Sequence, residues 1–151
     1  MDKLELVMRN TEEIVTVDEL KGLLEKPSRP RAYVGYETSG KVHLGHMLTA
    51  NKLLDLQRAG FDVVVLLADL HAFLNEKGSL EEVRQIADYN RDCFMALGLD
   101  PERTEFVYGT DYQLQPDFML KILQMARNTS LNRARRSMDE VSRNAENPMV
   151  S

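Results

Sequence analysis

The stretch Phe61–Ala68, which reads FDVVVLLA, constrains the fold of this chain more than any other part of it. It is an apolar run rich in valine, whose β-branched side chain favours extended backbone. A short run of this kind is typical of a strand buried on both faces, as in a parallel sheet. Its most apolar part, Val63–Ala68, is far too short to cross a bilayer. The run therefore predicts a buried strand of an α/β domain.

Further strands and helices alternate with this run. Residues 31–36 and 105–108 read as two more strands. The expected helices cover residues 2–9, 17–25, 45–58 and 79–97, with one or two more within 116–143. The central order is strand, helix, strand, helix, strand, helix. This order predicts a parallel sheet with right-handed crossovers, which is a Rossmann-like sheet flanked by helices.

Two of the expected helices begin with a capping box, in which a hydroxyl and a carboxylate three residues apart satisfy free amides. The pairs are Thr16 with Glu19 and Ser79 with Glu82. Cys93 lies beside the apolar stripe of the second helix and is expected to pack there. The stripe repeats every three or four residues and comprises Val83, Ile86, Ala87, Asn90, Phe94 and Leu97.

Composition excludes several classes of protein. The net charge of -5 argues against a protein that coats nucleic acid with its whole surface, although it permits a local basic patch. Cys93 is the only cysteine, so no disulfide can form within the chain and a reducing cytoplasm is the expected compartment. Met1–Glu5 lacks the basic region and apolar stretch of a secretory signal. We expect no association with a membrane.

The segment Gly35–His46, GYETSGKVHLGH, follows the first predicted strand. Ligands of open parallel sheets bind beyond the carboxyl ends of the strands. One interpretation is a P-loop, in which G-x-x-x-x-G-K is followed by a Ser or Thr that holds magnesium. Gly40 and Lys41 fit that spacing after Gly35, but the next residue is Val42, which has no oxygen. The P-loop interpretation fails at this ligand.

His43, Gly45 and His46 favour a second interpretation, the His-x-Gly-His element of class I aminoacyl-tRNA synthetases. Gly45 lets a nucleotide lie against the backbone, and a helix start offers free amides and partial positive charge to phosphate. The histidine rings offer N–H donors for charge that develops on the phosphates. A surface turn with two incidental histidines is one alternative. The other is a metal site formed by His43, His46, Asp69 and His71, although no H-E-x-x-H or cysteine pattern supports it.

Four segments resemble the archaeal and eukaryotic tyrosyl-tRNA synthetases, and they occur in the order of that family. They are Ala32–Glu37 with Ser39–His46, then Leu66–Asn75 (LLADLHAFLN), Gly109–Leu114 (GTDYQL) and Arg133–Met138 (RARRSM). The resemblance spans essentially the whole chain. It implies an N-terminal helical segment (1–30), the first half of a class I Rossmann-like catalytic domain (31–115) and the start of a helical connecting insertion (116–151).

The resemblance also implies roles for individual residues. His43 and His46 would be catalytic, and ATP with its Mg²⁺ would bind Thr38, Ser39, Gly40, Lys41, Gly45 and His46. L-Tyrosine would contact Tyr33, Gly35, Glu37, Leu66, Ala68, His71 and Gln113.

Alternatives stay open at several of these positions. If Tyr33 hydrogen-bonds the phenol hydroxyl of the substrate, the site can reject the analogue that lacks this hydroxyl by a factor on the order of 10⁴–10⁵. Tyr33 also fits a half-buried strand aromatic, and Leu66 and Ala68 fit plain core packing. Thr38 stands where many relatives have proline, which should loosen the turn without removing a phosphate contact.

Five arginines fall between residues 127 and 143. In the family this insertion supports dimerisation and touches the tRNA acceptor stem. The resemblance therefore implies that Arg133, Arg135 and Arg136 contact tRNA-Tyr. A solvated helix face with intrahelical ion pairs is the alternative.

The chain ends at Ser151, where the family continues with the second half of the fold, a KMSKS-type loop and an anticodon-binding domain. The expected function is that of a tyrosine–tRNA ligase with weak or no activity from this chain alone. The alternative is a truncated, non-catalytic homologue that binds ATP or tRNA. A half-sheet should expose apolar surface, so we expect a homodimer or other self-association.

Overall fold

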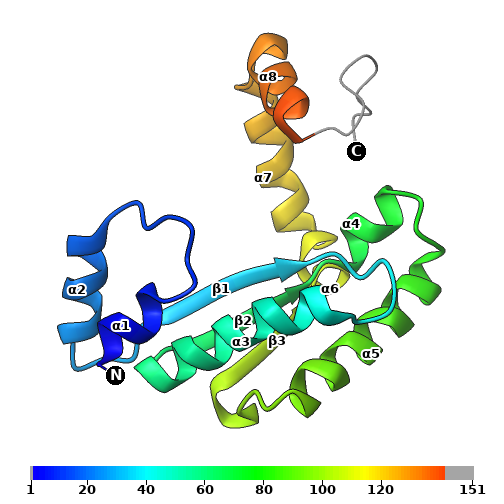
Figure 1. Ribbon diagram of the computed structural model, residues 1–151. Coiled ribbons are helices and arrows are strands. Elements are labelled where there is room, and N and C mark those ends of the chain that lie inside the picture. The colour runs from blue at the N-terminus through cyan, green and yellow to red at the C-terminus, as the bar shows by residue number, and fades with distance from the viewer. Residues whose placement is uncertain (1, 142–151) are drawn as a thin grey trace.

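A computed structural model describes residues 2–141 of the chain, with side chains up to residue 136 (Figure 1). Its centre is a parallel sheet in the order β1–β2–β3, formed by β1 (Arg31–Tyr36), β2 (Asp62–Leu67) and β3 (Thr104–Tyr108). The helix α3 (Leu44–Ala59) joins the first two strands, and α5 (Leu80–Ala96) lies between the second and third. The predicted Rossmann-like alternation is confirmed.

The starts and ends of these helices follow local signals. Gly60 ends α3 with a left-handed φ of 109°, a conformation that glycine adopts without strain. Ser79 and Glu82 form the predicted capping box at the start of α5. The other predicted box is wrong, because the Thr16 hydroxyl bonds the Glu19 carboxylate at 2.9 Å and no side chain caps the backbone of α2 (Val17–Glu25).

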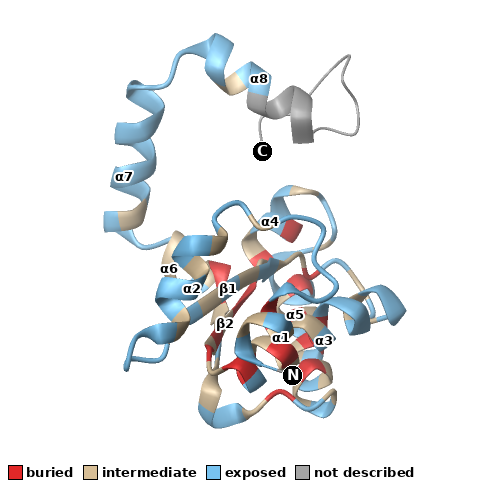
Figure 2. Ribbon diagram, turned by 60° about the vertical axis from the view of Figure 1, so that its left-hand side comes forward, coloured by how far each residue is buried: buried red, intermediate tan, exposed pale blue. Residues whose placement is uncertain are grey.

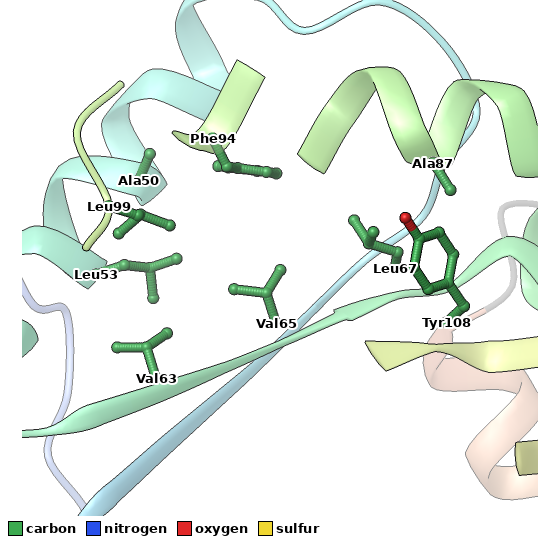
Figure 3. Close-up of a cluster of buried hydrophobic side chains, with 9 residues drawn as sticks. All are labelled: Ala50, Leu53, Val63, Val65, Leu67, Ala87, Phe94, Leu99 and Tyr108. Atoms are coloured by element: carbon green, nitrogen blue, oxygen red, sulfur yellow. The ribbon is translucent and has the colours of Figure 1, made fainter. Parts of the chain in front are cut away.

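The main core lies between one face of the sheet and the two crossover helices (Figure 3). Val63, Val65 and Leu67 of β2 point into it and are almost wholly buried. The opposite face of β2 is less covered, since Asp62 and Val64 are only half-buried. The prediction of burial on both faces therefore holds at Leu66, near the end of the strand, and is wrong for Asp62 and Val64. The reason is that α3 and α5 pack against the same face of the sheet.

The N-terminal helix α1 (Lys3–Met8) docks on α3. Arg9 makes two hydrogen bonds to Asp55 of α3, at 2.5 and 2.6 Å. The Lys52 ammonium donates to the backbone carbonyls of Val7 and Arg9, so a cation of α3 caps the negative end of α1. Polar contacts thus join the segment before β1 to the sheet domain.

The chain continues after β3 through α6 (Gly109–Gln113), α7 (Pro116–Arg127) and α8 (Leu131–Val141). Over its described residues, 116–141, the predicted helical region thus forms two helices. In Figures 1 and 2, α7 and α8 stand away from the sheet, and α7 is almost entirely exposed. Arg133, Arg135 and Arg136 are exposed on α8, whereas Arg143 lies outside the described residues. Within the described range, no helix has the length and apolar character needed to cross a membrane.

Candidate active site

The carboxyl ends of the three strands bring the predicted segments together at one edge of the sheet. The loop after β1 leads to α3, β2 leads through Ala68 into α4 (Asp69–Leu74), and β3 leads into α6. The Ala68 amide donates to the Tyr36 carbonyl at 2.8 Å, which joins the first two strand ends. The Asp69 carboxylate accepts from the Thr110 amide at 2.9 Å, which joins the second and third.

His43 and His46 form a reciprocal cap at the start of α3. The Gly45 amide donates to Nδ1 of His43 at 3.1 Å, and the His43 amide donates to Nδ1 of His46 at 3.3 Å. The two rings pack edge to face with centroids 4.3 Å apart. Imidazole nitrogens thus do what a hydroxyl and a carboxylate do in an ordinary capping box.

This cap sets the tautomer of both rings. A backbone amide can only donate, so each Nδ1 carries a lone pair and the proton of the neutral ring is on Nε2. Burial first, and then the charge of His43, lowers the pKa of His46. At neutral pH the start of α3 therefore presents two Nε2–H donors. The backbone amides at this helix start offer fewer free donors to a phosphate than expected, because those of Gly45 and His46 already bond within the turn.

Gly45 is required by the His43 ring. A Cβ at residue 45 would stand 2.9 Å from Cε1 of His43 and 3.1 Å from its Nδ1. Those distances are too short for an ordinary side chain, so only glycine lets the ring lie over the helix start. The predicted approach of a nucleotide to the backbone here is a second, compatible use of the same glycine.

The loop before the cap contains the other residues predicted to bind ATP. Ser39 and Lys41 are exposed, and Gly40 is half-buried. Gly40 and Lys41 line an open groove of 850 Å³ between this loop and α5. Two expectations for Thr38 are wrong, that it binds ATP and that it loosens the turn in place of proline. Thr38 is fully buried, and its hydroxyl donates to the Val83 carbonyl at 3.2 Å. It therefore anchors the loop to α5 and is not available to ATP.

The less covered face of the sheet presents Tyr33, Gly35 and Leu66. Tyr33 is 68% exposed, which excludes a half-buried packing role, whereas Leu66 is only 9% exposed. The Tyr33 hydroxyl lies over Gly35, 3.5 Å from where a Cβ would stand. Burial first, and then the charge of Tyr33, raises the pKa of Tyr112 on α6.

Glu37, His71 and Asn75 bridge the first two strand ends. The Asn75 amide donates to Glu37 Oε2 at 3.0 Å, and Nε2 of His71 lies 3.6 Å from the same oxygen. The residues considered for a metal site do not converge, since His43 and His46 cap α3 while His71 faces Glu37. In the part of the chain that the structure describes, no three His, Cys, Asp or Glu residues are placed to hold a metal ion.

A buried carboxylate holds the third strand end in place. Asp69 is fully buried and accepts from both the amide and the hydroxyl of Thr110, at 2.9 and 2.5 Å. Arg84 pairs with Asp111 and lies 3.7 Å over the Tyr108 ring. The Gln113 amide folds against Gly109, where a Cβ would also meet the Asp69 carboxylate at 3.0 Å. This network sets the position of α6, which carries Gln113.

Sequence reasoning missed three residues of this edge. Tyr112 and Asn75 lie inside segments singled out for their resemblance, but nothing in a short motif predicts the ring contact of Tyr112 with Phe118 or the bond of Asn75 to Glu37. Arg84 is half-buried on α5 and gave no signal, because its partner Asp111 is 27 residues away.

Known proteins share the sequence pattern and the fold of this chain. A family model described as "tRNA synthetases class I (W and Y)" matches residues 25–151. The chain therefore belongs to the class I tRNA synthetases for tryptophan and tyrosine, and the fold of three parallel strands flanked by helices is that of this class.

Within the family the similarity lies with archaeal tyrosyl members. The tyrosine–tRNA ligase of Methanosarcina mazei is 65% identical over all 151 residues, which cover 48% of that relative. The crystal structure of tyrosyl-tRNA synthetase complexed with L-tyrosine from Archaeoglobus fulgidus has a TM-score of 0.88 and 62% identity, covering 98% of this chain and 46% of that one. The Aeropyrum pernix synthetase gives a TM-score of 0.80 at 37% identity, over 93% and 44%. The chain thus spans about half the length of the curated relatives it matches.

Proposed function

We propose that this chain supplies the ATP-facing and tyrosine-facing wall of a tyrosine–tRNA ligase. The observation that carries the proposal is the His43–His46 cap at the start of α3, which follows β1, the strand whose less covered face carries Tyr33. The 62% identity to a synthetase whose structure holds L-tyrosine supports the choice of amino acid. The class I family supports ATP as the second substrate.

The reaction needs positioning and charge stabilisation more than a protein nucleophile. An oxygen of the tyrosine carboxylate forms a bond to the α-phosphorus of ATP, and the bond to pyrophosphate breaks. The Nε2–H groups of His43 and His46 would donate to phosphate oxygens as negative charge builds on the leaving group. Lys41, exposed on the adjacent loop, would add a positive charge. The tyrosyl group would then pass to the terminal ribose of tRNA.

Magnesium would enter this site on ATP. The described residues provide no group of carboxylates or histidines for it, so no protein ligand is assigned. Its chemistry when bound is to neutralise charge on the phosphates.

Selection of tyrosine would rest on Tyr33. Its exposed hydroxyl is free to bond the substrate phenol, and Gly35 leaves space beneath it. Ala68 and Leu66 would form the apolar wall, while Glu37, His71 and Gln113 would supply polar contacts. On α8, the exposed Arg135 and Arg136 would approach phosphates of the tRNA acceptor stem. The compartment we propose is the cytoplasm.

Calorimetric titration of tyrosine, with and without a non-hydrolysable ATP analogue, tests the proposal. We expect measurable tyrosine binding that tightens when the analogue is present, because both ligands would share one site. In Tyr33→Phe the preference for tyrosine over phenylalanine should largely disappear, since a lost hydroxyl partner removes the basis of discrimination. Binding of the analogue that ignores tyrosine, together with unchanged selectivity in Tyr33→Phe, would contradict the proposal. Because the chain spans about half of its relatives, we expect weak or no aminoacylation when it is assayed alone.

A further inference from the structure

A second pocket lies at the opposite end of the sheet, where the strands begin. It has a volume of 220 Å³ and lies between the N-terminal helices and the end of α3. Four cationic side chains line it, those of Lys3, Lys26, Arg29 and Arg103, and no acidic side chain of the described residues does. We call it the basic pocket. Its charge is unexpected in a chain whose net charge is -5.

Only part of this positive charge is used by the fold. Arg103 donates to the carbonyls of Gln57 and Phe61 at 2.8 and 2.6 Å and to Asp62 at 3.3 Å. Arg29 reaches the same Asp62 carboxylate at 3.7 Å, so one carboxylate serves two guanidinium groups. Among the described residues, Lys3 and Lys26 have no carboxylate within ion-pair distance.

The end of α3 would normally repel an anion, because helix carbonyls carry partial negative charge. Here two of those carbonyls, of Leu56 and Gln57, are engaged, the first by the Phe61 amide. The Gln57 carbonyl accepts from both Gly60 and Arg103, and Arg103 also covers that of Phe61. The Lys3 ammonium lies close to Gly60, 3.8 Å from where a Cβ would stand. The wall of the basic pocket is therefore dominated by cations.

We propose that the basic pocket binds a phosphate group. Arginine and lysine are the usual partners of phosphate oxygens, and the Ser28 hydroxyl adds a neutral donor on the same wall. At about 30 Å³ per water molecule, 220 Å³ has room for a phosphate group and some of its hydration water. This site is separate from the proposed ATP site, which lies at the carboxyl ends of the strands.

Titration of the ¹⁵N-labelled chain with inorganic phosphate at constant ionic strength tests the site. We expect saturable shifts of the Ser28 and Gly60 amides. Lys26→Gln combined with Arg29→Gln should raise the half-saturating concentration at least fivefold. Lys21→Gln is the matched control, since Lys21 is on α2, pairs with Asp18 at 3.6 Å and does not line the pocket. Circular dichroism should show that both variants fold, and Lys26→Gln alone should give a smaller change in the same direction.

A short RNA duplex in place of phosphate identifies the source of the group. Competition between duplex and phosphate at Ser28 and Gly60 would support a nucleic-acid backbone as the ligand, and saturation by phosphate alone would support a free phosphate compound. Shifts that do not saturate, or equal affinity in the double variant and the control, would overturn the proposal. The amides of Gly40–His46 report separately on the ATP site, so failure of one site leaves the other measurable.

Discussion

At the scale of single residues, His43, Gly45 and His46 depend on one another. The His43 ring lies where a side chain at residue 45 would stand, and each histidine fixes the other's position through the cap. The tautomer that caps the helix is also the one that leaves Nε2–H free for a phosphate. Structure and proposed chemistry therefore use the two nitrogens of each ring for different purposes.

Gly45→Ala is expected to disturb this unit. Alanine normally stabilises a helix by roughly 0.5–1 kcal/mol relative to glycine, and Gly22→Ala on α2, which has nothing within 4 Å of the new Cβ, should show that gain. At residue 45 the ring must move and the cap, worth about 1 kcal/mol, is lost. Urea unfolding should therefore show no gain for Gly45→Ala, while ATP-analogue binding weakens. A gain equal to that of Gly22→Ala would contradict the interlocked cap.

His46→Asn separates the cap from the donor. Asparagine Oδ1 can accept from the His43 amide in place of Nδ1, but no Nε2–H remains.

Because burial lowers the pKa of His46 below 6.5, the unfolded chain takes up the proton first as the pH falls. The stability contributed by neutral His46 is therefore full above about pH 6.5 and declines below it. Unfolding midpoints between pH 7.5 and 5.5 should fall less in His46→Asn than in the wild type, while binding of the ATP analogue is lost. The control is His71→Asn. An equal fall of the unfolding midpoint in His46→Asn and in the wild type would argue against assigning the pH dependence to His46.

At the scale of elements, α1 is held to α3 by charges that the sequence pattern did not reveal. Asp55 is buried on α3 and its pKa is lowered, first by the hydrogen bond from Arg9. We expect Asp55→Asn to cost roughly 1–3 kcal/mol, because Arg9 loses its charged partner beside a buried position. Amides of α1 should exchange faster with solvent. Asp18→Asn, at an exposed surface pair, should cost about 0.5 kcal/mol or less. Equal costs for the two variants would mean that the Asp55 contact does not hold α1.

At the scale of the whole molecule, α7 leaves the sheet with its apolar side chains in water. Leu123 and Met125 are 62% and 69% exposed, and Leu120 is 55% exposed. Apolar exposure of this extent usually marks an interaction surface, so we expect concentration-dependent self-association. Sedimentation velocity should show it for the wild type and for the control Gln124→Lys, but not for Leu120→Lys combined with Leu123→Lys. A wild type that stays monomeric at the highest attainable concentration would exclude this surface.

The sequence by itself determined the alternation of strands and helices, the capping box at Ser79 and the family. Those features depend on local periodicity and on short motifs, which a linear reading contains. The tertiary structure alone decided that α3 and α5 share one face of the sheet, and that this leaves Tyr33 and Leu66 on the other. It also placed Thr38 in the core through a bond to Val83, 45 residues away, and set the histidine tautomers. These outcomes depend on contacts between residues that only packing brings together, and no local pattern encodes them.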